Sequence, residues 1–307
     1  MPVASFDDLY RAADDARLMT PVAVAGAADP TVLAALRAAC DRGWVQPIVA
    51  GREIDVRRTA DACSVSVNGF EFLDTEEPAS AAVAAVCSGR AKLLTKGQIA
   101  TPALMRAILD PAAGLRTERV VCQIPLVELS AANRRFLMAD TGICIQPTLR
   151  QKLDILQSAV ELAHALGADC PRVALMAATE SVMESMPETL EAEEVRRRWR
   201  AGEIPGCIVD GPLSFDLAFA ADAADKKRVG GDVAGAADVM LFPNLLSANL
   251  TIKAIMYTAD CRFGGVLCGA RAPVAFMSRA DTTTTRLNSL AIALRLASQR
   301  SRQMTEV

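Results

Sequence analysis

Four short apolar segments in the second half of the chain each end in residues that could bind or act on a ligand. They are Cys207–Val209, Val239–Phe242, Val266–Cys268 and Val274–Met277, followed by Asp-Gly-Pro, Pro-Asn, Gly-Ala and Ser-Arg respectively. Short apolar segments closed by such residues are typical of buried parallel strands. Open α/β sheets bind ligands at the carboxyl ends of their strands. The pattern therefore predicts a ligand site at that edge, where the hydroxyl of Ser278 and the guanidinium of Arg279 lie.

A further candidate lies upstream, where a predicted strand over residues 92–95 ends in Lys96 and Gly97. Glycine allows the backbone to approach a phosphate closely, so this pair is a candidate anion site. The alternative is an exposed lysine in a turn. The loop Gly26–Pro30 does not fit a dinucleotide site, because its G-A-A-D-P spacing is not G-x-G-x-x-G.

Five stretches, taken together, resemble the phosphate acetyl/butyryltransferases, which move an acyl group between coenzyme A and inorganic phosphate. They are LLTKG (93–97), KLDILQSAVELAHALG (152–167), VDGPLSFD (209–216), ADVMLFPNLLSAN (237–249) and GGVLCGARAPVAFMSRADT (264–282). The resemblance runs in order from about Lys92 to the C-terminus. It is specific as a set, and it is closer to the butyryl-type branch than to the acetyl-type branch.

The expected fold class is α/β. The chain has 307 residues, which suits two domains, and strands alternate with helical patterns, which indicates mostly parallel sheets. The resemblance implies two α/β domains with an interdomain cleft, related in fold to the isocitrate and isopropylmalate dehydrogenases. We expect residues 1–147 and 271–307 to form the first domain and residues 148–270 the second.

The reaction that the resemblance implies is acyl-CoA + phosphate ⇌ acyl phosphate + CoA, by direct transfer in a ternary complex. Phosphate is a dianion that a guanidinium can bind through two hydrogen bonds. The attacked carbonyl passes through an oxyanion, which fixed donors must stabilise. The resemblance implies that Arg279 holds the phosphoryl group and that Ser278 donates a hydrogen bond to the thioester.

The thiol base is less well defined. Acetyl-type members carry an aspartate seven residues after the matching serine, and that position is Thr285 here. Asp281 and Asp210 are possible substitutes, and the sequence does not choose between them. Asn244 also stands where the family commonly has aspartate.

The resemblance further implies that substrate contacts come from Lys96, Gly97, Arg106, Gly211 and Asn249. Arg106 lies on a predicted helix over residues 101–109, where the alternative is a surface charge. The alternative for the Asp210 carboxylate is to cap a turn.

Other chemistries find less support in the sequence. A covalent route through Cys261 or Cys268 needs an adjacent base, and none is evident. His164, the single histidine, has apolar neighbours that favour a packing role. A dehydrogenase would show a DxxxD-like metal-binding cluster late in the chain, which is missing. A non-catalytic acyl-CoA or phosphate binder is kept open by Thr285 and Asn244.

Composition limits the partners. The net charge of −3 offers no basic excess for nucleic acid, and no segment approaches the ~18 apolar residues of a membrane span. The 9 cysteines are scattered without CxxC spacing, which favours a reducing cytoplasm over a disulfide framework or a zinc site. Coenzyme A and phosphate enter as substrates, and no metal or other cofactor is expected. The resemblance implies a homodimer.

Overall fold

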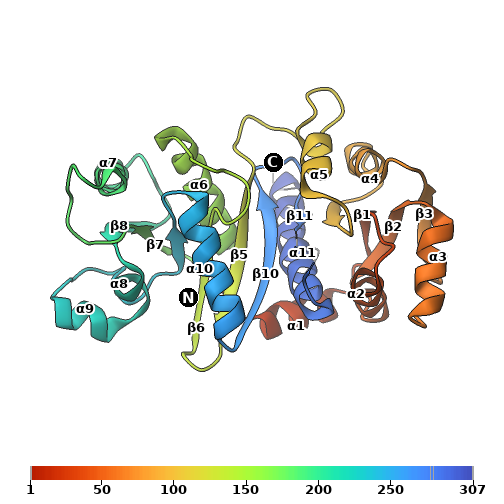
Figure 1. Cartoon of the computed structure of the whole chain (residues 1–307), viewed down its shortest axis with the longest axis horizontal. Helices are drawn as coiled ribbons and strands as arrows, with labels where there is room; N and C mark the ends of the chain where they lie inside the picture. Colours follow the sequence, from red (N-terminus) through yellow and green to blue (C-terminus); the bar gives the residue numbers. More distant parts are fainter. Residues whose placement is uncertain (1, 277, 279, 306–307) are drawn as a thin grey trace. The chain divides into compact units, whose positions relative to one another are not determined.

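The computed structural model describes residues 2–276, 278 and 280–305, with side chains as far as residue 299. The chain forms two compact units (Figure 1). Unit 1 comprises residues 1–5 and 120–262, and unit 2 comprises residues 6–119 and 263–307. These boundaries differ from the expected ones at 147/148 and 270/271.

The described residues of unit 2 form six sheet strands in the order β3-β2-β1-β4-β11-β10. They are β1 (Thr20–Ala25), β2 (Val45–Gly51), β3 (Glu71–Asp74), β4 (Leu93–Lys96), β10 (Cys261–Cys268) and β11 (Val274–Ala275). All neighbours pair in parallel except β10 and β11. The carboxyl ends of β1, β4 and β11 therefore lie along one edge of this sheet.

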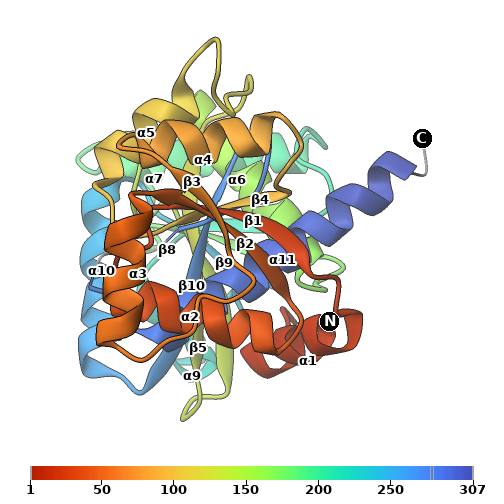
Figure 2. The same ribbon diagram turned by 90° about the vertical axis from the view of Figure 1, so that its right-hand side faces the viewer.

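The helices of unit 2 cover both faces of its sheet. They are α1 (Phe6–Ala16), α2 (Pro30–Asp41), α3 (Glu53–Ala62), α4 (Pro78–Cys87), α5 (Thr101–Leu109) and α11 (Thr283–Thr305). Figure 2 shows α4 and α5 on one face and α2 and α3 on the other. As the sequence predicts, α2 starts with Asp29 as its N-cap and Pro30 in its first turn.

The described residues of unit 1 form five sheet strands in the order β5-β6-β9-β7-β8. They are β5 (Cys122–Leu129), β6 (Arg134–Ala139), β7 (Arg172–Met176), β8 (Ile208–Leu213) and β9 (Val239–Leu241). β5 and β6 are antiparallel and the other pairs are parallel. Because β6 pairs with β9, backbone hydrogen bonds tie residues 134–139 into unit 1, and the boundary falls before β5 instead of at 147.

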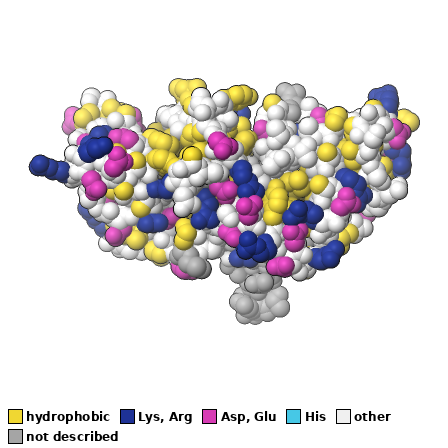
Figure 3. All heavy atoms as spheres, turned by 90° about the horizontal axis from the view of Figure 1, so that it is seen from below, with side chains coloured by type: hydrophobic (Ala, Val, Ile, Leu, Met, Phe, Trp, Pro, Cys, Tyr) yellow, Lys and Arg dark blue, Asp and Glu magenta, His cyan; other side chains and the backbone are white. Residues whose placement is uncertain are grey.

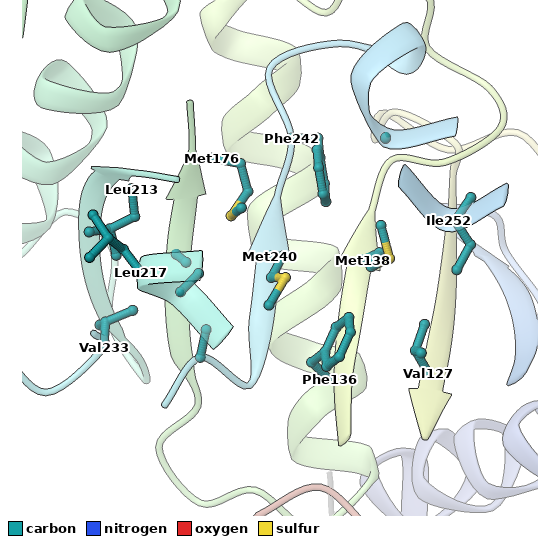
Figure 4. Packing of buried hydrophobic residues seen from close by; sticks show 14 of the residues in the cluster. Val127, Phe136, Met138, Met176, Leu213, Leu217, Val233, Met240, Phe242 and Ile252 are labelled. Carbon is teal, nitrogen blue, oxygen red and sulfur yellow. The ribbon is translucent and has the colours of Figure 1, made fainter. Parts of the chain in front are cut away.

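Five helices accompany this sheet: α6 (Leu149–Ala165), α7 (Pro187–Arg200), α8 (Phe215–Phe219), α9 (Ala221–Lys227) and α10 (Leu245–Thr258). One face of the sheet packs under α8, α9 and α10 through buried side chains that include Phe136, Met138 and Met240 (Figure 4). Burial of this apolar surface is the main force holding the layers together.

The α/β fold class with mostly parallel sheets is confirmed, whereas the expected interdomain cleft stays a prediction. Within the described ranges, no helix is both long enough and apolar enough to cross a membrane. On the face drawn in Figure 3, basic and acidic side chains are interspersed.

Candidate functional site

The loop after β11 holds Ser278 through its backbone. The N–H of Ser278 donates to the Asp281 carboxylate at 2.7 Å, and the N–H of Asp281 donates to the Ser278 carbonyl at 3.3 Å. The Ser278 side chain is exposed, and its Oγ accepts the N–H of Ala280 at 3.4 Å, so its O–H is available as a donor. The structure therefore brings Ser278 and Asp281 together. Arg279 lies outside the described residues.

The position of the acetyl-type base is a buried, uncharged hydroxyl. The Thr285 Oγ lies 3.1 Å from the Thr282 Oγ, and Thr285 is 7% exposed. Arg286, the next residue, is 2% exposed and donates from Nη2 to the Ser278 carbonyl at 3.4 Å. Arg286 was not among the residues predicted from the sequence, since an arginine inside a helix usually signals a solvated face.

Lys96 is 1% exposed at the end of β4, so the alternative of an exposed lysine in a turn is wrong. Its Nζ donates to the Gly97 carbonyl at 3.4 Å. A buried ammonium is costly unless it has polar or anionic partners. The adjacent Thr95 Oγ is also buried, and it has no hydrogen-bond partner among the described residues. Polar groups of this kind suit an anion site.

Gly97 meets a packing requirement. A Cβ on Gly97 would lie 1.7 Å from the Gly26 carbonyl oxygen, because the loops after β1 and β4 touch through their backbones. The N–H of Gln98 also donates to the Gly26 carbonyl at 2.7 Å. Glycine is therefore required by the neighbouring loop, and a direct contact between Gly97 and substrate stays a prediction.

The edge formed by β1, β4 and β11 is where this sheet would be expected to bind a ligand. β1 and β4 are neighbours, yet α2 and α5, which follow them, lie on opposite faces (Figure 2). Ligands bind at such topological switch points in open α/β sheets. β11 pairs with the other side of β4, with Ala275 opposite Thr95. Lys96 ends β4, and the Ser278 loop follows β11, which is adjacent to β4. Both therefore lie at the same edge of the sheet, which is the candidate site.

Asp210 lies in unit 1, and its surroundings differ from those expected. The prediction that the strand ends at Val209 is wrong, because β8 continues to Leu213, which pairs with Met176 of β7. The half-buried Asp210 carboxylate accepts a hydrogen bond from Arg196 at 3.2 Å and another from the Gly211 N–H at 2.8 Å. Both hydrogen bonds go to Oδ1, which is thus engaged within unit 1.

Gly211 is buried inside β8 with φ +146, a conformation that favours glycine. A Cβ there would lie 2.6 Å from the Cβ of Leu175 on β7. Close packing of the two strands accounts for this glycine, and its contact with substrate stays a prediction.

Asn249 and Asn244 are both placed by α10. Asn249 Nδ2 donates to the Thr141 carbonyl at 3.1 Å, joining the helix to the loop after β6. Asn244 is the N-cap of α10, and its Oδ1 accepts the Ser247 N–H at 3.0 Å. Asparagine and aspartate are comparable N-caps, so the departure from the family pattern at Asn244 leaves the helix start intact.

Asp140, which was not among the residues predicted from the sequence, organises the loop that Asn249 contacts. The Asp140 carboxylate accepts four backbone N–H groups, of Gln123, Gly142, Ile143 and Cys144. Burial raises the pKa of Asp140, while those four N–H donors lower it. The signal in the sequence is an acidic residue directly after a buried strand.

Arg106 is exposed on the last turn of α5. An exposed position also fits a surface charge, so its role in substrate binding stays a prediction.

The surroundings of the Cys261 and Cys268 thiols and of the His164 ring are those of structural residues. Burial and the neighbouring Asp260 raise the pKa of the Cys261 thiol, which disfavours the nucleophilic thiolate. Cys268 is 5% exposed. His164 Nδ1 lies 2.8 Å from the Ala168 carbonyl at the end of α6. Among the described residues, no three His, Cys, Asp or Glu side chains are grouped as metal ligands.

A groove of about 450 Å³ lies at the opposite edge of the unit 2 sheet. It is lined mainly by apolar side chains of α1 and α11, together with Thr20, Pro21 and Lys92 near the amino ends of β1 and β4. Its position separates it from the Ser278 loop and Lys96.

Comparisons with known proteins give these residues a context. Residues 75–294 match the family model described as "Phosphate acetyl/butaryl transferase". The chain belongs to that family. A phosphate butyryltransferase of Clostridium acetobutylicum is 37% identical over 91% of this chain and 94% of the relative. A phosphate acetyltransferase of Thermotoga maritima is 34% identical over 89% of this chain and 93% of the relative.

A solved structure shows the same relationship. The crystal structure of a branched-chain phosphotransacylase from Enterococcus faecalis V583 is similar with a TM-score of 0.80 and 29% identity. The structural match covers 91% of this chain and 99% of the phosphotransacylase chain. The family is one of acyltransferases, so the chain is an acyltransferase, and the expected family is confirmed.

Proposed function

We propose that the protein reversibly transfers a short-chain acyl group, acetyl or butyryl, between coenzyme A and inorganic phosphate. The observation that carries the proposal is the Ser278 loop at the carboxyl edge of unit 2. Its backbone is held by hydrogen bonds while its hydroxyl is exposed and able to donate. The names of the relatives supply the reaction class.

In this proposal each substrate group meets a specific residue. The Ser278 hydroxyl donates to the thioester oxygen as negative charge develops there. Arg279, the next residue in the sequence, binds the phosphoryl group through its guanidinium. Lys96 adds a buried positive charge at the end of the neighbouring strand. Direct transfer in a ternary complex then depends on holding phosphate beside the thioester carbon, which can supply much of the rate.

Asp281 is the better candidate for the thiol base. Its carboxylate accepts the Ser278 N–H and so lies in the same loop as the proposed catalytic hydroxyl, whereas the Asp210 carboxylate accepts hydrogen bonds from Arg196 and Gly211 of unit 1. In the reverse reaction the base would take the proton of the CoA thiol as its sulfur attacks the acyl carbon of the acyl phosphate, and the bond from that carbon to the phosphate oxygen would break to release inorganic phosphate. Asn249 and Gly211, both in unit 1, are proposed as further substrate contacts.

We also infer a cytoplasmic homodimer. The cysteines that the structure describes form no disulfide bond with one another, which suits a reducing compartment. α10 exposes an apolar stripe at Leu246, Leu250 and Tyr257, which are 69%, 63% and 79% exposed. Exposed apolar side chains gathered on one helix indicate a protein interface, and a second copy of the chain is the partner proposed for it.

The test is phosphate-dependent release of CoA thiol from acetyl-, propionyl-, butyryl- and isobutyryl-CoA, with and without a metal chelator. Release with any of these acyl groups supports the transferase and ranks its substrates, and insensitivity to the chelator supports a reaction without metal. Binding of acyl-CoA without release would favour the non-catalytic binder instead.

A further inference from the structure

A buried arginine joins two loops at the edge of unit 2 that holds the candidate site. Arg286 lies in the first turn of α11 and is 2% exposed. Its Nε donates to the Thr31 Oγ at 2.9 Å, and its Nη2 donates to the Ser278 carbonyl at 3.4 Å. Thr31 starts α2 after β1, and Ser278 follows β11. One planar guanidinium thus connects the first loop of the unit to the loop of the proposed catalytic serine.

Two carboxylates complete the surroundings of Arg286. Burial lowers its pKa, and the charges of Asp29 and Asp281 oppose that effect. Asp29 caps α2 by accepting the N–H groups of Thr31 and Val32 at 2.9 and 3.1 Å. Asp281 accepts the Ser278 N–H at 2.7 Å. The guanidinium therefore carries a positive charge beside two acidic groups that each fix a loop.

Ser278 is consequently held on both sides of its peptide backbone. The Asp281 carboxylate accepts a hydrogen bond from the Ser278 N–H, and the Arg286 guanidinium donates one to the Ser278 carbonyl oxygen. The Ser278 side chain stays exposed. A side chain whose backbone is fixed in this way keeps one direction for its hydroxyl. Preorganised donors of this kind stabilise developing charge without a cost of reorganisation during the reaction.

We propose that Arg286 is a positioning residue for acyl transfer, acting through Ser278. This inference rests on the proposed function, since it assigns Ser278 to the reaction. Arginine is required because its planar guanidinium donates to the Thr31 hydroxyl and the Ser278 carbonyl at the same time. A lysine ammonium on a single flexible side chain makes such a pair of contacts poorly.

The experiment compares Arg286→Lys, Arg286→Gln, Ser278→Ala and the double variant Ser278→Ala/Arg286→Gln in full-length protein. Lysine retains the charge between the two carboxylates, so thermal stability should stay near that of the unaltered protein. Loss of positioning should nevertheless lower kcat on the order of 10–100-fold, with KM for acyl-CoA changed by less than about threefold. Amide hydrogen exchange in the Ser278–Thr282 loop should increase in both Arg286 variants.

The double variant gives the decisive comparison. If Arg286 acts through Ser278, the double variant should be no slower than Ser278→Ala alone, because coupled residues have non-additive effects. Arg134→Gln is the matched control. Arg134 lies at the start of β6 in unit 1 and donates to the carbonyls of Phe219 and Ala237. Its loss should therefore lower stability and leave kcat unchanged.

If the fold-losses in kcat of the two single variants multiplied in the double variant, the positioning role would be wrong. It would also be wrong if Arg286→Lys changed neither kcat nor amide hydrogen exchange in the Ser278–Thr282 loop. An unaltered protein that releases no CoA from any acyl-CoA would overturn the proposed function and this role with it. The two failures are therefore distinct.

Discussion

At the scale of single residues, the buried ammonium of Lys96 is the clearest indication of an anion site. It ends β4 at 1% exposure, beside the buried hydroxyl of Thr95. Removing an ammonium from water is costly unless it gains polar or anionic partners. A buried positive charge at the end of a strand, beside a buried hydroxyl that has no partner among the described residues, argues for a role in binding phosphate.

Lys96→Met should therefore raise KM for phosphate roughly 10–100-fold, because a hydrogen bond to a charged group contributes about 1.5–3 kcal/mol. Lys92→Met, at an exposed lysine just before the same strand, is the control. Equal KM values for the two variants would rule out an anion site at Lys96.

The choice between two carboxylates as thiol base is also a question at this scale. Asp281→Asn should lower kcat/KM on the order of 100-fold or more, because an amide cannot accept the thiol proton. Asp210→Asn should cost less than about tenfold, since that carboxylate is engaged by Arg196. Initial rates with CoA and acyl phosphate measure both. A larger loss at Asp210 would reverse the assignment.

The thiols of the half-buried Cys144 and the buried Cys207 should be slow to react. Burial raises the pKa of Cys144 to about 12 and that of Cys207 to about 11. At pH 8 only about one such thiol in 10³ to 10⁴ is ionised, and the thiolate fraction rises about tenfold for each pH unit. Alkylation with iodoacetamide followed by mass spectrometry should label the exposed Cys87 and Cys170 first. Early labelling of Cys144 would contradict this.

At the scale of elements, the start of α10 combines a capping residue with a departure from the family pattern. The Asn244 side-chain oxygen accepts one hydrogen bond from the Ser247 N–H and another from the Ser247 hydroxyl. Either asparagine or aspartate can make these contacts. The difference is the negative charge, which would lie at the positive end of the helix dipole.

Asn244→Ala should lower the free energy of unfolding by about 1 kcal/mol, because the N-cap hydrogen bond is lost. Asn244→Asp should raise it by about 0.3–1 kcal/mol through the helix dipole. Urea denaturation measures both. If the two variants were equally stable, the cap would not be contributing, and Asn244 would have to be explained by substrate contacts alone.

At the scale of the whole molecule, the apolar stripe on α10 leads to a prediction about assembly. Leu250→Glu should convert a dimer to a monomer in light scattering coupled to gel filtration, because a buried unpaired carboxylate strongly disfavours an interface. Ile54→Glu, in unit 2, is the matched control, since Ile54 is 64% exposed and Leu250 is 63% exposed. A dimer that persists in Leu250→Glu would place the interface elsewhere.

Local features of the molecule could be predicted from the sequence. Asp29-Pro30 predicts the start of α2, and Gly167 predicts the end of α6, because caps depend on a few neighbouring residues. Short apolar segments predict most strands, because burial in a parallel sheet demands a continuous apolar run. The five motifs, taken as a set, indicate the family, since each is contiguous in the chain.

Features that depend on distant partners were decided only by the tertiary structure. Pairing of β6 with β9 placed residues 120–147 in unit 1, and pairing of β8 with β7 carried the strand past Asp210. Burial of Lys96, and the contact of Arg286 with Thr31 across 255 positions, depend on segments that meet only after folding. The physical reason is that a residue's type fixes what it can bond, whereas its burial and its partners are fixed by how the sheet brings distant strands to one edge.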